Sequence, residues 1–270
     1  MIYLKAVMLA VVEGLTEFLP VSSTGHLILV DAVISLSDDP SFNVLFMMLI
    51  QLPAVLAVVL YFRNDLQPFG VEKSKRAANL RLWSKVLVAF VPAAALGILV
   101  KDFIDAHLLA PAPVSLALLV GGIVLVIIER GHRNVTASSV DQIGLRTALG
   151  IGVFQCLALI PGTSRSAATI VGAMLLGTSR AAAAEFSFLL AIPTMIGVAV
   201  YTIFDRGLSI TVHQWGVVAL GSLVSFAVAY AAVAAFMSYI KRHSFALFGY
   251  YRIILAAIVL AALASGWLPS

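Results

Sequence analysis

Six uninterrupted apolar runs are the feature that most constrains how this chain folds. Each approaches the roughly 20 residues that cross a bilayer as one helix. Only 11% of the residues are charged and 61% are hydrophobic, whereas about a quarter of an ordinary soluble domain is charged. Because the runs are continuous and do not alternate as strands do, the sequence predicts an all-α polytopic membrane protein. The six runs cover residues 42–62, 83–100, 114–128, 182–204, 215–240 and 248–268.

Two further apolar stretches, residues 2–33 and 147–176, are broken in the middle by proline and polar residues. Their arms have only about 10–18 residues, which favours re-entrant helical hairpins over full spans. Each half of the chain is then one hairpin followed by three transmembrane helices. An odd number of spans per half reverses the second half. The sequence therefore predicts an inverted-topology repeat, residues 1–130 and 145–270, within a single integral membrane domain.

Basic residues are concentrated in alternate loops. Lys and Arg gather in residues 63–85, 129–147 and 240–252, while residues 101–113 and 205–214 are nearly balanced. The positive-inside rule places the first three loops in the cytoplasm and the other two outside. The first hairpin then enters from the outside, which favours a site that opens externally. The same rule accounts for the net charge of +4, so no nucleic-acid partner is expected.

Two acidic residues interrupt the first broken stretch. Glu13 and Glu17 are four residues apart and therefore share one helix face. Either the face lines water, or one of the two carboxyl groups keeps its proton, or a cation sits between the two carboxylates. Carboxylate oxygens suit Mg²⁺ or Ca²⁺, so Glu13 and Glu17 are the candidate ligands of a divalent cation.

A turn rich in hydroxyl groups follows the two acids. Ser22, Ser23 and Thr24 stand at the start of the second arm, and His26 comes two residues later. One hydroxyl suffices to cap a helix. Backbone N–H groups at a helix start also bind phosphate, and a serine near a histidine and a carboxylate can be an activated nucleophile. His26 can equally be a satisfied interior histidine.

The second broken stretch carries a similar turn. Gly162 permits a tight backbone, and the hydroxyl and N–H groups around it can cradle an anion. The planar guanidinium of Arg165 matches phosphate oxygens. At rest it can pair with an acid of the first turn, either as a purely structural ion pair or until a phosphate replaces that acid. Thr169 lies one helical turn after Arg165. The remaining hydroxyl residues of this turn are Thr163, Ser164 and Ser166.

These groups together predict an anion site at membrane depth, which suits an amphiphilic ligand with a phosphate head and an apolar tail. Segments 13–26 and 161–166 resemble the two signature regions of the bacterial undecaprenyl-diphosphate phosphatases of the bacitracin-resistance (BacA) type, and segment 185–193 is similar to that family as well. The resemblance spans nearly the whole chain. It implies hydrolysis of a C55 polyprenyl diphosphate to the monophosphate, which recycles the lipid carrier of peptidoglycan and other envelope polymers. It also implies a divalent cation and a multi-pass location in the bacterial plasma (inner) membrane.

The resemblance also implies a role for each matching residue. Glu13 and Glu17 would be the acidic pair, and Arg165 would clamp the diphosphate. Ser23 and His26 would be the nucleophile or acid–base candidates. The chain departs from the family pattern at Ala167, where glycine is usual, and at Pro53, where a small residue is typical. The groups expected to support diphosphate binding are Ser22, Thr24, Gly162, Thr163, Ser164, Ser166 and Thr169.

Several alternatives remain open at this stage. Ser23, His26 or a water molecule can be the nucleophile, with His26 or Glu17 as general base. A different class of function is a lipid or ion transporter, because inverted repeats with broken helices are typical of transporters. A phosphatase of the phosphatidic-acid type would need a histidine shortly after Arg165, but the next one is His213. The expected partners are the polyprenyl diphosphate and membrane lipids, with a homodimer left open.

Overall fold

The computed structural model describes residues 1–31, 34–67, 72–131 and 134–267. Its regular elements in these ranges are helices, apart from one isolated bridge between Ala137 and Thr178. Six of the helices are long and apolar enough to cross a membrane, which confirms the predicted all-α polytopic membrane protein. The helices are α1 (Ile2–Thr16), α2 (Ser23–Asp31), α3 (Pro40–Tyr61), α4 (Arg63–Leu66), α5 (Lys73–His107), α6 (Pro111–Arg130), η1 (Val140–Gln142), α7 (Leu145–Gln155), η2 (Cys156–Leu159), α8 (Arg165–Leu175), α9 (Arg180–Arg206), α10 (Val212–Ile240) and α11 (Ala246–Ala264).

Two element boundaries differ from those expected. The second long helix, α5, begins at Lys73, so it includes much of the basic segment that the sequence placed in the loop 63–85. Polar residues allow a helix to continue beyond the membrane, and hydropathy alone does not show where it ends. Arg252, counted above as a loop charge, lies inside α11 and is fully buried.

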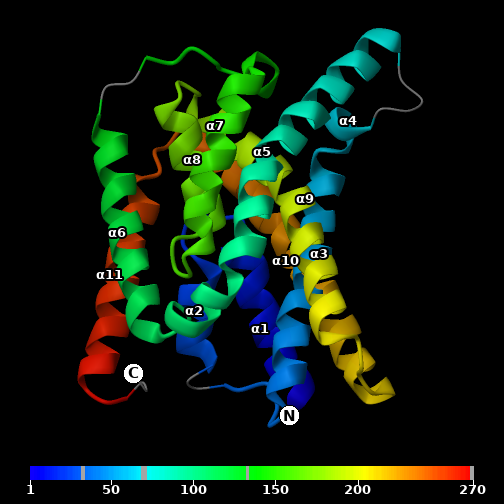
Figure 1. The fold of residues 1–270 in the computed structure, drawn as a ribbon, viewed down its shortest axis with the longest axis vertical. Helices are drawn as coiled ribbons and strands as arrows, with labels where there is room; N and C mark the ends of the chain where they lie inside the picture. Colours follow the sequence, from blue (N-terminus) through cyan, green and yellow to red (C-terminus); the bar gives the residue numbers. More distant parts are fainter. Residues whose placement is uncertain (32–33, 68–71, 132–133, 268–270) are drawn as a thin grey trace.

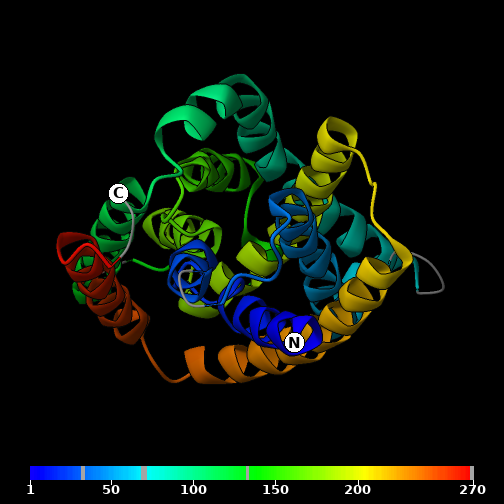
Figure 2. The same cartoon turned by 90° about the horizontal axis from the view of Figure 1, so that it is seen from below.

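The two pairs of short helices occupy opposite halves of the molecule. In Figure 1, α1 and α2 lie in the lower half, and α7 and α8 lie in the upper half. The turn within each pair points toward the middle. Seen from below in Figure 2, α2, α7 and α8 lie toward the centre, while α5, α6, α10 and α11 run around the outside. The fold therefore brings the two hydroxyl-rich turns together inside a wall of long helices.

Small residues allow the short helices to pack closely against the long ones. A Cβ atom at Gly14 of α1 would lie 2.9 Å from the carbonyl oxygen of Ser225 in α10. At Gly152 of α7 it would lie 2.2 Å from the carbonyl oxygen of Ala89 in α5. Such close approach is typical of helix packing in membranes, and it fixes each pair of short helices against its neighbours.

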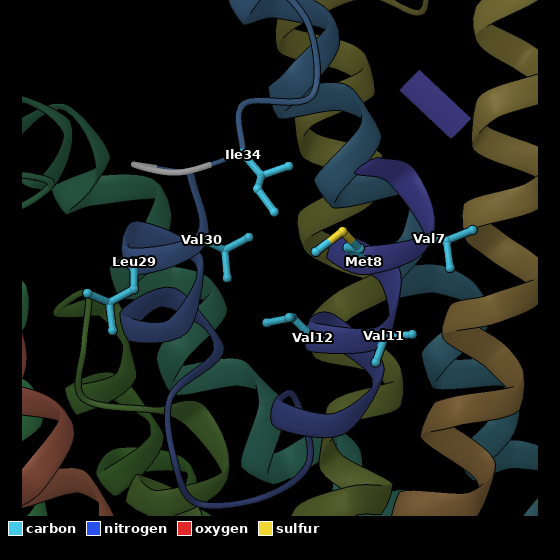
Figure 3. A pocket seen from close by; sticks show the side chains of 7 residues that line it. All are labelled: Val7, Met8, Val11, Val12, Leu29, Val30 and Ile34. Atoms are coloured by element: carbon cyan, nitrogen blue, oxygen red, sulfur yellow. The ribbon is translucent and has the colours of Figure 1, made fainter. Parts of the chain in front are cut away.

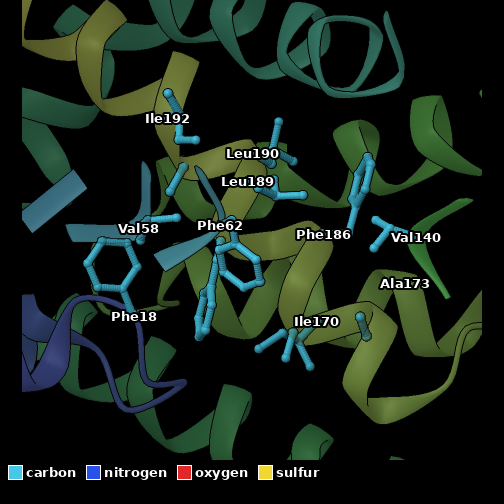
Figure 4. Close-up of a cluster of buried hydrophobic side chains, with 14 of the residues drawn as sticks. Phe18, Val58, Phe62, Val140, Ile170, Ala173, Phe186, Leu189, Leu190 and Ile192 are labelled. Atoms are coloured by element: carbon cyan, nitrogen blue, oxygen red, sulfur yellow. The ribbon is translucent and has the colours of Figure 1, made fainter. Parts of the chain in front are cut away.

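A cluster of buried apolar side chains supports the first turn. The rings of Phe18 and Phe188 meet edge to face with centroids 5.6 Å apart, an arrangement that aromatic pairs favour. Figure 4 shows Phe18 at one side of a cluster that also contains Val58, Ile170 and Phe186 from three helices. Phe18 directly follows Glu17 in the chain, so this packing anchors the position of the acid.

Candidate active site

The two hydroxyl-rich turns contact each other directly. The Ser166 hydroxyl donates a hydrogen bond of 2.9 Å to the carbonyl oxygen of Leu19. A guanidinium nitrogen of Arg165, Nη2, lies 3.4 Å from Oε1 of Glu17. The side chains of Arg165 and Glu17 are only 10% and 8% exposed. An acid from the first turn therefore pairs with the arginine of the second turn at a largely water-excluded point.

Ser23 completes this cluster. Its hydroxyl donates a hydrogen bond of 2.8 Å to Oε2 of Glu17, the carboxylate oxygen that Arg165 does not contact. Glu17 therefore holds a potential nucleophile with one oxygen and a guanidinium with the other. A hydroxyl that already donates to a carboxylate is placed to lose its proton to that carboxylate.

The Arg165 side chain is held from several sides. Its Nη1 donates to the carbonyl oxygen of Ser187, 2.9 Å away, and its guanidinium carbon lies 5.7 Å from the centre of the Phe18 ring. Its Nε is buried and has no hydrogen-bond partner. These contacts fix the orientation of the guanidinium.

Thr169 and Ser166, expected to bind phosphate, are instead fully buried behind the turn. The Thr169 hydroxyl donates to the carbonyl oxygen of Arg165, 2.9 Å away, and lies 2.6 Å from the hydroxyl of Ser187. The hydroxyl of Ser166 donates its hydrogen bond to the carbonyl oxygen of Leu19 in the other turn. Both side chains therefore position the turn, and neither lines the pocket described below.

Glu13 is buried one helical turn before Glu17. Both of its carboxylate oxygens lack a hydrogen-bond partner, and the side chain has no exposed surface. An unpaired buried carboxylate is costly, and a bound cation is one way to relieve that cost. Among the described residues, no group of three or more His, Cys, Asp or Glu side chains is close enough to hold a metal ion. A cation here would therefore take its further ligands from elsewhere, such as phosphate oxygens.

His26 faces away from this cluster. Its Nδ1 lies 2.8 Å from the carbonyl oxygen of Ser22, and its Nε2 lies 2.6 Å from the hydroxyl of Tyr251 in α11. Since a carbonyl oxygen can only accept, Nδ1 carries the hydrogen and Nε2 accepts the tyrosine O–H. Both ring nitrogens are engaged, so the structure does not bring His26 to Ser23 as a base.

The two turns share an unusual backbone geometry. Ser22 and Ser164 have positive φ angles of 69° and 71°, and among the described residues they are the only ones other than glycine that do. Each immediately precedes a helix, α2 or α8, and each hydroxyl accepts the N–H of the third residue onward, at 3.4 Å in Gly25 and 3.2 Å in Ala167. Strained backbone of this kind is often retained at functional sites.

Gly162 is required at its position for two reasons. Its φ of +93° favours glycine, and a Cβ atom would lie 2.2 Å from the carbonyl oxygen of Val114 in α6. Thr163, the next residue, donates its N–H to the carbonyl of Ile160, 3.1 Å away, and does not line the pocket. The side chain of Thr24 lies outside the described part of the structure.

A pocket of about 840 Å³ begins at this cluster. Its polar end is formed by Glu17, Ser22, Ser23, Gly162, Ser164 and Arg165. Its walls are mostly apolar and come from α5 and α9, with residues such as Phe90, Ala94, Met195 and Val198. The pocket extends to Lys101 and Asp205, whose charged groups lie 3.2 Å apart. It therefore offers a polar head site joined to a long apolar channel.

A second cavity, between α1 and α2, has a different character. It measures about 440 Å³ and is lined by aliphatic side chains and Met8 alone. Figure 3 shows the side chains of Met8, Val12 and Val30 extending into the space between the two helices, with no polar group among those drawn. It has no means of recognising a charged head group.

Two polar residues near the site received no role from the sequence. Ser187 holds both Arg165 and Thr169, as described above. Gln155 is 1% exposed, lines the pocket and lies 3.3 Å from the hydroxyl of Thr194. Polar side chains inside apolar helices are expensive, and that signal alone marks both positions.

Comparison with known proteins agrees with this geometry. Residues 6–258 match the family model described as "Bacitracin resistance protein BacA". "Undecaprenyl-diphosphatase 1" of Clostridioides difficile (strain 630) is 46% identical, over 95% of this chain and 94% of that protein. "Undecaprenyl-diphosphatase" of Enterococcus faecalis is 46% identical, over 95% of both chains. The protein of that name from Fusobacterium nucleatum is 48% identical, over 95% of this chain and 99% of its own. The chain therefore belongs to the bacitracin resistance protein BacA family.

Proposed function

We propose that this protein is an undecaprenyl-diphosphate phosphatase, which hydrolyses undecaprenyl diphosphate to the monophosphate and inorganic phosphate. The observation that carries the proposal is the pocket that joins Glu17, Ser23 and Arg165 to a long apolar channel. An amphiphile with a diphosphate head and a prenyl tail fits both ends. The names of the relatives support this substrate. The reaction recycles the lipid carrier used for peptidoglycan synthesis and is consistent with bacitracin resistance.

The contacts of Glu17 support a mechanism with Ser23 as the nucleophile. Glu17 takes the proton of the Ser23 hydroxyl, to which it is hydrogen-bonded at 2.8 Å. The hydroxyl oxygen attacks the terminal phosphorus, and the bond from phosphorus to the bridging oxygen breaks. Glu17 passes the proton to the departing oxygen, so the lipid monophosphate leaves and a phosphoserine remains. The Glu17 carboxylate then takes a proton from water, which attacks the phosphoserine phosphorus. Inorganic phosphate is released, and the proton returns from Glu17 to the Ser23 oxygen.

Arg165 and the two helix starts stabilise the charge that develops in this reaction. The guanidinium of Arg165 lies at the polar end of the pocket and neutralises phosphate oxygens. The first N–H groups of α2 and α8 follow Ser22 and Ser164 at the polar end of the pocket. Helix N-termini of this kind favour anions. Phosphoryl transfer depends mainly on such positioning and charge neutralisation.

Glu13 and Glu17 are the residues that would hold a divalent cation, Mg²⁺ or Ca²⁺. The unpaired carboxylate of Glu13 fits this role, and hard cations prefer oxygen ligands. When bound, the cation supplies additional positive charge to the phosphate oxygens.

The membrane arrangement that supports this function is an inverted-topology repeat in the bacterial inner membrane. The two halves, residues 1–130 and 145–270, each begin with a re-entrant hairpin and continue with three spans. The matching positive φ angles of Ser22 and Ser164 support their equivalence, as do the prolines within α3 and α9, Pro53 and Pro193. The pocket reaches Lys101 and Asp205, near the weakly charged loops, which supports a mouth on the external side.

The proposal is tested by phosphate release from undecaprenyl diphosphate by the protein purified in detergent. Glu17→Gln and Ser23→Ala should each lose at least about 1,000-fold in kcat, as removal of a nucleophile or its base does elsewhere. Glu72→Gln and Ser209→Ala, at exposed sites, are the matched controls and should keep full activity.

Metal removal is a second test of the same site. A chelator should abolish phosphate release, and added Mg²⁺ or Ca²⁺ should restore it. Glu13→Gln should need a higher metal concentration for the same activity.

Two results would overturn the proposal. One is a wild-type protein that releases no phosphate, and the other is full activity in the Glu17 and Ser23 variants. Because the assay contains no membrane and no gradient, turnover in it also separates an enzyme from the transporter considered above.

A further inference from the structure

Arg252 is a fully buried cation that the proposed mechanism does not use. It lies in the second turn of α11, and its side chain has no exposed surface. Its guanidinium donates to four backbone carbonyl oxygens at 3.2–3.5 Å. Two of them, in Ala117 and Leu118, belong to α6. The other two, in Pro20 and Gly162, belong to the two hydroxyl-rich turns.

The two turn carbonyls occupy equivalent positions. Pro20 precedes Ser22 by two residues, and Gly162 precedes Ser164 by two residues. Ser22 and Ser164 are the residues with positive φ angles that directly precede α2 and α8. The side chain of Arg252 in the last helix therefore donates hydrogen bonds to equivalent carbonyl oxygens in both turns, although the three segments are far apart in the sequence.

The neighbouring helix leaves room for this side chain. A Cβ atom at Gly121 of α6 would lie 2.2 Å from Nη2 of Arg252, and one at Gly122 would lie 3.0 Å from its Cβ. Among the described residues, no carboxylate forms an ion pair with Arg252. A buried charge is retained at a cost unless its donors are satisfied. Here backbone carbonyls satisfy them, and no carboxylate in the described part of the chain pairs with the positive charge.

We propose that Arg252 is a positioning residue for the diphosphate site. By drawing the carbonyl oxygens of Pro20 and Gly162 toward α11, it turns their negative ends away from the bound head group. The turns then present N–H groups and hydroxyls to the anion. Its unpaired charge lies behind both turns and adds to the positive potential at the head site, beside that of Arg165. This inference rests on the proposed function, because it assumes that the site binds a diphosphate.

The test separates positioning from simple packing. Arg252→Met keeps much of the volume but removes both charge and donors. The buried carbonyl oxygens of Pro20 and Gly162 then lose a donor, so its thermal unfolding temperature should fall, and kcat is measured per folded molecule. Its kcat should nevertheless fall about 100-fold, as expected when reacting groups are misplaced by an ångström. Inorganic pyrophosphate should inhibit it more weakly than the wild type.

Two further variants test the same proposal if Arg252→Met does not fold. Arg252→Lys keeps the charge but cannot reach four carbonyls, so it should retain more pyrophosphate inhibition than Met while losing kcat. Gly121→Ala places a Cβ atom against the guanidinium of Arg252 and should lower kcat without altering Arg252 itself. Arg130→Lys and Gly131→Ala, at the exposed end of α6, are the matched controls and should behave as the wild type.

The inference is overturned if the Arg252 and Gly121 variants keep wild-type kcat and pyrophosphate inhibition. It is also overturned if activity falls only in proportion to the loss of folded protein. These outcomes are distinct from failure of the proposed function, which would show as a wild-type protein without phosphate release.

Discussion

At the scale of single residues, hydrogen bonding distinguishes the two candidate nucleophiles. Ser23 donates to Glu17, whereas both ring nitrogens of His26 are engaged by Ser22 and Tyr251. General acid–base groups contribute about 100-fold or more to a rate. We therefore expect His26→Asn to lose less than about tenfold in kcat, well below that threshold for a general base. Steady-state phosphate release measures the effect.

Tyr251→Phe is the matched control for this prediction. It removes the partner of His26 and leaves the histidine in place, so its effect should be as small as that of His26→Asn. A loss in His26→Asn as large as the loss in Ser23→Ala would contradict the placement of His26 and return it to the catalytic groups.

Residue type alone predicted which side chains gather at the turns, but not which way each one faces. Glu17, Ser23 and Arg165 line the pocket as expected, while Ser166 and Thr169 are buried behind it. Helical spacing shows which residues share a face, yet the partner that covers this face comes from a distant segment. For Thr169 that partner is Ser187, and no local pattern points to it.

At the scale of elements, the turns depend on a few backbone positions that carry no catalytic group. Gly162 combines a φ of +93° with a close approach to Val114. A non-glycine residue with such a φ costs about 1–3 kcal/mol, and a Cβ atom would also displace α6. We expect Gly162→Ala to lower the unfolding temperature in detergent by at least about 5 °C, given the usual relation between stability and melting.

Gly131→Ala provides the comparison for this prediction. Gly131 ends α6 with a φ of −76°, and the nearest atom to an added Cβ is 3.6 Å away. Its unfolding temperature should match that of the wild type. An equal decrease in unfolding temperature in both variants would mean that the positive φ angle of Gly162 contributes nothing specific to stability.

Composition predicted where the transmembrane helices lie, whereas their exact ends and buried charges depend on packing. The six spans were predictable because long apolar runs have no other stable place to go. The length of α5 and the burial of Arg252 were not. The sequence around an arginine at the edge of an apolar run looks the same whether its side chain faces water or lies between helices. The pair Gly121–Gly122 only weakly indicates the space that Arg252 needs.

At the scale of the whole molecule, the direction in which the pocket opens decides which leaflet supplies the substrate. The pocket extends to the Lys101–Asp205 pair near the ends of α5 and α9, which Figure 1 places at the same end as both termini. The basic segments around residues 73–85 and 241–242 lie toward the other end. The positive-inside rule puts that other end in the cytoplasm, so the pocket should open to the outside.

Cysteine labelling tests this orientation in intact cells. The single cysteine, Cys156, is first replaced by serine, and Ser209→Cys and Ser138→Cys are then introduced separately at exposed positions of opposite loops. A membrane-impermeant maleimide should label Ser209→Cys in intact cells and Ser138→Cys only after the membrane is opened. The reverse pattern would place the pocket mouth in the cytoplasm. The substrate would then have to reach the site from the inner leaflet.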